Sequence, residues 1–340
     1  MRTRTRLTLL PLLIAPFLGG CENWTWGGTE FSVQPPPPPV STSPEEAPPE
    51  AELPSLEPIT LGPLLYLVER EGSSRARIVP LAVRGAEGYS ALPDPAETPD
   101  LVERFPIERW ERGTEFILLH GGVRVGTFTA DGSTELDESW CRPRAVGQGS
   151  LELRVFEEAP ERFLALRRGD LSEVPTGLAP HPAPQMTDEI RNASLEAART
   201  LIPRLGIPWP PTVLGIRERV DAFGDGIGAR ALAASFVYDD GLVIGPAGPN
   251  AFSLFVVARE REGEWVPALS WYEQAGASGK AAAGFLGAHD LRAQGEVDLV
   301  IEVFGPGARW VAIVPESDDT LVYRDPCGRD PAQGAIRVHR

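Results

Sequence analysis

Residues that could do chemistry are scattered along the 340-residue chain, and few of them stand at spacings that suggest a reaction. The four histidines are His120, His181, His289 and His339. None of them stands at a metal-ligand spacing from another histidine or from a cysteine. We therefore expect His120 and His289 to be structural residues at strand ends or turns, and we expect neither a metal nor a cofactor.

Neither a complete phosphate-binding loop nor the nucleophile elbow of serine hydrolases is found in the sequence. The segment Gln274–Ala281 has the outline of a phosphate-binding loop, but its first residue replaces a glycine and its last replaces the hydroxyl residue that would bind magnesium. No G-x-S-x-G nucleophile elbow occurs. A triad such as Ser235, His289 and Asp239 could be assembled from distant loops. We favour a protein without enzymatic activity. An exported hydrolase is the alternative.

The first 20 residues have the pattern of an export signal. Three arginines precede an apolar stretch that ends at Leu18 and is too short to span a bilayer. Gly19, Gly20 and Cys21 follow. This arrangement resembles the lipobox of bacterial lipoproteins, which implies cleavage before Cys21, a diacylglycerol thioether on its sulfur and an acylated N-terminus. Two or more acyl chains such as palmitate would hold the protein stably on the lipid bilayer.

The residue after the cysteine bears on the destination of the protein. Glu22 occupies the position that resembles the sorting residue of Gram-negative lipoproteins, and it is not the aspartate associated with inner-membrane retention. The sequence thus predicts an exported protein that is lipid-anchored to the cell envelope, with the outer membrane favoured. The alternative is an ordinary secretory signal in which a cysteine happens to follow the two glycines.

Residues 21–60 predict an acylated N-terminus followed by a disordered linker. Prolines run without interruption from Pro35 to Pro39, and five glutamates lie between Glu45 and Glu57. Such a segment has too little apolar surface to fold and favours an extended polyproline II conformation. We expect it to act as a stalk that holds a folded part some tens of Å from the membrane.

From about residue 61 the sequence predicts a mainly β (α+β) fold, with two antiparallel β-rich subdomains joined by one helix. The expected parts are an N-terminal β-rich domain at 61–170, a proline-rich connector and helix at 171–210, a C-terminal β-meander at 211–328 and a flexible tail at 329–340. Apolar runs of strand length support this division, together with short connections that can only join antiparallel neighbours.

Turn and cap residues place two of these elements more closely. Gly121 and Gly122 separate the apolar runs 115–120 and 123–129, which predicts a hairpin with positive φ tolerated in its turn. Thr187 can cap a helix whose apolar residues recur at helical spacing until Pro203 ends it. We expect this helix to pack on a sheet.

A weak internal repeat lies in the C-terminal part. Asp221 is followed five residues later by Gly226, and Asp290 by Gly295, each time ahead of a predicted strand and a later hairpin with a tryptophan. This pattern resembles the loops of the VCBS and FG-GAP families of extracellular repeats, whose D-x-D-x-D-G motif often holds calcium. In that motif, alternate carboxylates converge on one ion and the glycine permits a sharp turn.

The two copies depart from the motif in ways that matter for the metal. The first copy retains Asp221 and Asp225 but has Phe223 in place of the middle acid, and the second has Arg292 beside its single acid. The resemblance therefore implies degenerate repeat loops that keep their turns, at Gly226 and Gly295, without a metal. Calcium at Asp221 and Asp225 is the alternative.

Besides Cys21, the chain contains Cys141 and Cys327. In an oxidising compartment two leftover cysteines most often pair. We expect a disulfide that closes a loop of nearly 190 residues and fastens the first half of the fold to its last strand. A reactive cysteine nucleophile is the alternative.

The charge balance limits the class of partner. Asp and Glu number 48 against 32 Lys and Arg, which gives a formal net charge of −16. Phosphates repel an acidic surface, so nucleic acid is not an expected partner. The sequence predicts a membrane-anchored envelope lipoprotein that acts as a non-enzymatic binding or structural module toward an envelope protein or glycan.

The lipobox leads to a test of anchoring. Cys21→Ser removes the sulfur that would be acylated, so we expect metabolic labelling with a fatty-acid analogue to be abolished and the protein to leave the membrane fraction. Labelling followed by fractionation measures both effects. Labelling that survives the substitution would show that the lipobox is not used.

Overall fold

The computed structural model describes residues 61–338, apart from 86–87, 99, 122, 155–159, 171–184, 207–209, 225–229, 277–278, 292–296, 316–322 and 327–334. The chain divides into two compact units, 1–58 and 59–340. All the described residues belong to the second unit. The predicted signal peptide at 1–20 and linker at 21–60, including Cys21, lie outside the described residues.

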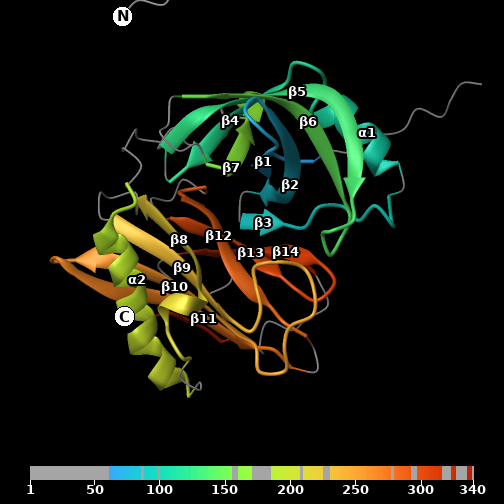
Figure 1. Cartoon of the computed structure of the whole chain (residues 1–340). Coiled ribbons are helices and arrows are strands. Elements are labelled where there is room, and N and C mark those ends of the chain that lie inside the picture. The colour runs from blue at the N-terminus through green and yellow to red at the C-terminus, as the bar shows by residue number, and fades with distance from the viewer. Residues whose placement is uncertain are drawn as a thin grey trace, which may run out of the picture. The chain divides into compact units, whose positions relative to one another are not determined.

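The first β-rich part is a closed antiparallel barrel of six strands (Figure 1). Its strands are β1 (Leu64–Arg70), β2 (Arg75–Gly85), β4 (Glu115–His120), β5 (Val123–Asp137), β6 (Arg144–Leu153) and β7 (Arg162–Arg167). They pair in the order β1-β7-β4-β5-β6-β2, and β1 pairs with β2 to close the ring. The short strand β3 (Gly88–Ser90) extends β2. Closure leaves no exposed edge among the six strands.

The barrel encloses its own core. Side chains of β1 alternate, so that Leu64, Tyr66 and Val68 belong to the internal cluster while Leu65 and Leu67 belong to a second cluster outside the ring. Helix α1 (Leu101–Arg109) contacts β5 and β6 and adds to the internal cluster. Because both faces of β1 are buried, its sequence is a continuous apolar run rather than an alternation.

The second β-rich part consists of two antiparallel sheets. The five-stranded sheet has the order β16-β11-β10-β9-β8, and the four-stranded sheet has the order β12-β13-β14-β15. The strands are β8 (Arg217–Gly224), β9 (Arg230–Tyr238), β10 (Phe252–Arg261), β11 (Glu264–Gln274), β12 (Ala282–His289), β13 (Asp298–Phe304), β14 (Arg309–Pro315), β15 (Tyr323–Arg324) and β16 (Ala335–Val338).

Buried clusters show how these elements form layers. One cluster joins the outside of the barrel to the four-stranded sheet, a second joins the four-stranded sheet to the five-stranded sheet, and a third joins the five-stranded sheet to helix α2 (Asp188–Leu201). Figure 1 shows α2 lying across β8–β11. The four-stranded sheet is thus buried on both faces, and β12, β13 and β14 are buried along their whole length.

The predicted fold class is confirmed. The chain is mainly β, and helix α2 connects the antiparallel strands that precede it in the sequence to those that follow it. Thr187 caps α2, its hydroxyl accepting a hydrogen bond from the Ile190 amide at 3.3 Å. Gly121 has φ 58° in the turn between β4 and β5, as the hairpin requires.

Residues 335–338, predicted within a flexible tail, instead form β16 and pair with β11. Ile336 and Val338 favour a strand there.

A buried cluster of charged side chains lies between the barrel and the four-stranded sheet. Its centre is Arg309 of β14, whose side chain is 6% exposed. Its Nη1 donates to Glu69 Oε1 of β1 at 3.0 Å and to Glu302 Oε1 of β13 at 2.9 Å, and its Nη2 donates to Asp137 Oδ2 of β5 at 3.1 Å. Burial acts to lower the pKa of Arg309, but Glu69 and Glu302 outweigh it and raise that pKa.

Two more arginines complete this cluster. Arg77 Nε donates to Glu69 Oε2 at 2.8 Å, and Arg162 Nη1 donates to Glu302 Oε2 at 2.5 Å. Three arginines thus face three carboxylates, those of Glu69, Glu302 and Asp137, so the cluster is close to neutral. Because an isolated buried charge is costly, this balance is what permits the cluster to be buried.

A tryptophan connects this cluster to a second buried ion pair. The guanidinium carbons of Arg309 and Arg144 each lie 4.2 Å from the centroid of the Trp140 ring. Arg144 bonds to the Asp325 carboxylate, which also accepts from the Val311 amide at 3.0 Å. Cation–π contact favours guanidinium groups over an indole face. The charged interface therefore extends across the barrel surface from β1 to β6.

Candidate functional site

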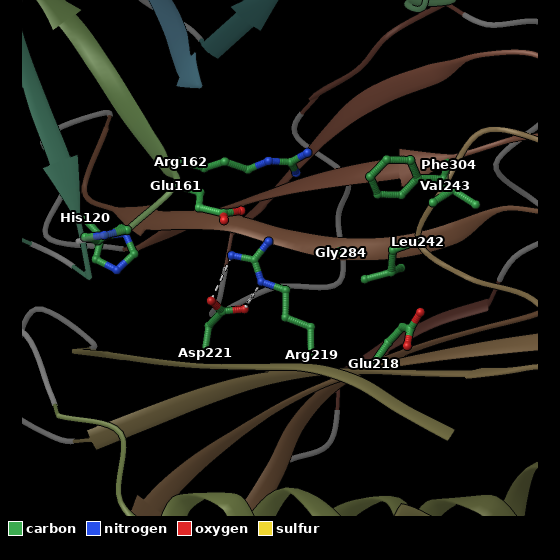
Figure 2. A pocket seen from close by; sticks show the side chains of 11 residues that line it. His120, Glu161, Arg162, Glu218, Arg219, Asp221, Leu242, Val243, Gly284 and Phe304 are labelled. Carbon is green, nitrogen blue, oxygen red and sulfur yellow. Dashed lines mark hydrogen bonds and ion pairs between the residues drawn. The ribbon is translucent and has the colours of Figure 1, made fainter. Parts of the chain in front are cut away.

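A cavity of about 580 Å³ lies where the barrel meets the two sheets (Figure 2). Its volume is within the range of small-molecule sites. The residues that line it are His120, Pro160, Glu161, Arg162, Glu218, Arg219, Asp221, Leu242, Val243, Gly284 and Phe304. They come from β4, β7 and the two residues before it, β8, β12, β13 and the loop between β9 and β10, so no single sequence segment defines the cavity.

The arginines of the cavity are already bonded to protein carboxylates. Arg219 binds Asp221 through two hydrogen bonds, from Nε to Oδ2 at 2.7 Å and from Nη2 to Oδ1 at 2.9 Å (Figure 2). Such two-pronged pairs are strong and geometrically fixed. Arg162 bonds to Glu302 and lies 3.5 Å from Glu69 Oε1. Through Arg162, the wall of the cavity is continuous with the buried charged cluster.

An apolar wall lies apart from this polar end. Figure 2 shows Leu242, Val243 and Phe304 together on the side away from His120. Val243 is 61% exposed. A Cβ added at Gly284 would meet Leu242 Cδ1 at 3.5 Å, an ordinary contact. The absence of a side chain at Gly284 therefore leaves space in the cavity rather than relieving a clash.

The loop that supplies Leu242 and Val243 is held at several points. The Lys280 ammonium, the single lysine of the chain, donates to Asp240 Oδ1 at 2.5 Å and to the Gly241 carbonyl at 3.1 Å, and both side chains of this ion pair are buried. The Gly245 amide donates to the Gly305 carbonyl at 3.2 Å. Lys280, which a phosphate-binding loop would present to a nucleotide, instead fixes one wall of the cavity.

Two histidines lie at strand ends, as predicted. His120 ends β4 and His289 ends β12. Burial lowers the pKa of His120, and Arg219 acts in the same direction, whereas Asp221 and the backbone of Arg162 oppose the shift. Burial and the charge of His120 lower the pKa of His289 to about 4. His289 is 4% exposed, and its Nε2 has no hydrogen-bond partner within the described part of the chain. Both imidazoles are therefore neutral at pH 7.

Of the residues predicted from the repeat resemblance, the structure describes Asp221 and Asp290. Asp221 lies within β8, opposite Ala233, and its carboxylate is occupied by Arg219. Asp290 follows the end of β12. Asp225, Gly226 and Gly295 lie outside the described residues. In the ranges that the structure covers, no group of three or more His, Cys, Asp or Glu side chains could hold a metal ion.

Ser235 and Cys141 are not among the residues that line the cavity. The Ser235 hydroxyl donates a hydrogen bond to the Ala283 carbonyl at 2.8 Å. Cys141 packs against the cluster between the two sheets and is a disulfide cysteine. Cys327 lies outside the described residues, so its pairing with Cys141 stays a prediction.

Comparison with known proteins adds no relationship. No protein-family model matches the chain, no curated protein is significantly similar to it in sequence, and no solved structure is significantly similar to it in fold. In the described part of the chain, no helix is both long enough and apolar enough to cross a bilayer.

The buried histidine predicts a pH-dependent stability. Because the pKa of His289 in the fold lies below its ordinary value of 6.5, the unfolded chain binds more protons between about pH 6.5 and pH 4. Burial of His289 therefore does not reduce the free energy of unfolding above pH 6.5. As the pH falls from 6.5 to 4, that free energy decreases by up to about 1.4 kcal/mol per pH unit. Urea unfolding from pH 7 to pH 4.5 measures this slope.

His289→Gln should reduce the slope, because glutamine does not titrate. An equal slope in the protein and in His289→Gln would contradict the burial cost assigned to His289.

Proposed function

We propose that the protein is a lipid-anchored envelope lipoprotein whose folded part is a non-enzymatic binding module, with its ligand in the cavity between the barrel and the sheets. The observation on which this proposal rests is a cavity of about 580 Å³ whose two arginines are bonded to protein carboxylates. A fixed polar end and an adjoining apolar wall are the usual composition of a binding site.

The chemistry of the lining supports binding rather than catalysis by a hydroxyl, thiol or amine nucleophile. Such a nucleophile must lie within hydrogen-bond reach of a base. The described lining residues comprise three carboxylates, two arginines, one histidine and apolar residues or glycine, with neither Ser, Thr, Cys nor Lys among them. The exported hydrolase remains the alternative proposal, and it would need a water activated by His120 or by a lining carboxylate.

The envelope location rests on the sequence. The lipobox at Leu18–Cys21 and the proline-rich segment after it predict an anchor and a spacer, which together would present the cavity to ligands near the membrane. A disulfide between Cys141 and Cys327 would suit the same exported setting and is proposed with it.

Filling the cavity tests the binding proposal. Gly284→Leu places a side chain against Leu242 and Phe304 without backbone strain. A small-molecule fragment library is screened by ligand-observed NMR against the full chain carrying Cys21→Ser. We expect a set of fragments to bind the protein, and we expect Gly284→Leu to weaken them at least about tenfold because the space is occupied, which corresponds to about 1.4 kcal/mol.

The matched control is Gly307→Leu. Gly307 lies in the exposed turn between β13 and β14, where an added Cβ would meet nothing within 4 Å, so binding should be unchanged. Fragments that bind Gly284→Leu as well as they bind the protein, or the absence of any bound fragment, would contradict the proposal.

A further inference from the structure

The charges around the cavity do not balance once the internal ion pairs are considered. Arg219 is neutralised by Asp221, and Arg162 belongs to the neutral buried cluster with Glu302 and Glu69. His120 has a lowered pKa and is neutral at pH 7. The remaining charged residues of the lining are Glu161 and Glu218. Among the described residues, the lining of the cavity therefore has an excess of two negative charges.

Neither of these carboxylates is occupied by the protein. Within the described residues, the side chains of Glu161 and Glu218 form no ion pair or hydrogen bond. Figure 2 shows Glu161 at the polar end beside Arg162 and Glu218 near Leu242 on the apolar side. Both glutamates are exposed to solvent, and their two carboxylates extend the negative potential along the cavity.

The position of Glu218 is a product of local backbone geometry. The pairing of β8 with β9 shifts register between Arg217 and Arg219, which leaves Glu218 as the extra residue of a bulge. Bulges of this kind redirect a side chain and are common beside functional sites. A Cβ built at Gly241 would lie 3.4 Å from Glu218 Oε1, which places this carboxylate against the loop that supplies the apolar wall.

We propose that the cavity binds a small organic cation, an ammonium or guanidinium group on an apolar body, with the cation at Glu218 and the apolar body against Leu242, Val243 and Phe304. This inference rests on the proposed function, since it names the class of ligand for the same cavity. Glu161 acts at a greater distance, through the potential of the cavity.

An anion or a metal ion fits this cavity less well. An anionic ligand would have to take Arg219 from Asp221 or Arg162 from Glu302, which leaves a carboxylate without its partner. A metal ion needs several converging ligands, and the described residues include no group of three side chains that could hold one. An organic cation needs one carboxylate and an apolar surface, and both are present.

Three probes of one shape test the proposal: phenethylammonium, 2-phenylethanol and phenylacetate, which are cationic, neutral and anionic. Isothermal titration uses the full chain carrying Cys21→Ser at 50 mM salt. We expect phenethylammonium to bind at least about tenfold more tightly than 2-phenylethanol and phenylacetate not to bind detectably. Raising the salt to 500 mM should weaken phenethylammonium alone, because salt screens the charges.

Variants separate the two carboxylates. Glu218→Gln should weaken phenethylammonium by about tenfold and Glu161→Gln by about threefold, since the second acts at longer range. Glu264→Gln, which changes an exposed glutamate of β11, is the matched control and should change the affinity less than twofold. Circular dichroism verifies that all three variants fold.

The outcomes distinguish this inference from the proposed function. If 2-phenylethanol or phenylacetate binds as tightly as phenethylammonium, and Gly284→Leu blocks that binding, then the cavity is a binding site but the cation inference is overturned. Phenethylammonium that binds equally to Glu218→Gln and to the protein also overturns it. If no probe binds, the inference fails, and the fragment screen alone then decides the proposed function.

Discussion

The buried Arg309 guanidinium is the interaction on which the arrangement of this protein depends. It joins Glu69 and Asp137 of the barrel to Glu302 of the four-stranded sheet. Arg77 and Arg162, which bind Glu69 and Glu302, complete a near-neutral cluster. Replacing a complete buried cluster by apolar residues is often neutral for stability, whereas removing one member leaves charges without partners. The cluster therefore fixes how the barrel and the sheet meet rather than adding net stability.

The cavity follows from that arrangement. Arg162 takes part in the charged cluster and also lines the cavity, so the geometry of the barrel and sheet interface sets the position of the polar wall. The apolar wall depends on a separate buried pair, Lys280 with Asp240, which holds the loop before β10. Protein carboxylates compensate the charges of Arg162 and Arg219. The uncompensated charge of the described lining therefore comes from Glu161 and Glu218.

The sequence predicted those elements whose causes are local. The helix after Thr187 and the hairpin turn at Gly121 follow from a capping hydroxyl and a backbone that tolerates positive φ. Helix α1 was missed, because it is short and contains Pro106, and its stability comes from packing on the barrel. The closure of β1 on β2 and β7 was also missed, because sequence periodicity does not distinguish a closed ring from an open sheet.

The cavity could not be predicted, because its residues come from six separate segments and become neighbours only in the fold. The sequence pattern indicated that Asp221 belongs to a degenerate calcium loop. In the structure Asp221 lies in a strand and pairs with Arg219, two residues before it. An Arg-x-Asp pair in a strand places both side chains on one face, and this signal could have been recognised. The bulge at Glu218 leaves no mark in the sequence.

The Arg309 cluster makes the barrel and the sheets one cooperative unit, and native-state hydrogen exchange across a denaturant series tests this cooperativity most directly. Peptides from β4 and β13 should share one opening free energy, and Arg309→Met should lower both values by about 3–5 kcal/mol. Arg168→Met, which removes the exposed pair with Glu115, should lower them by at most about 1 kcal/mol. Barrel and sheet peptides that open at different free energies in the unmodified protein, or an Arg309→Met variant no less stable than Arg168→Met, would contradict the account.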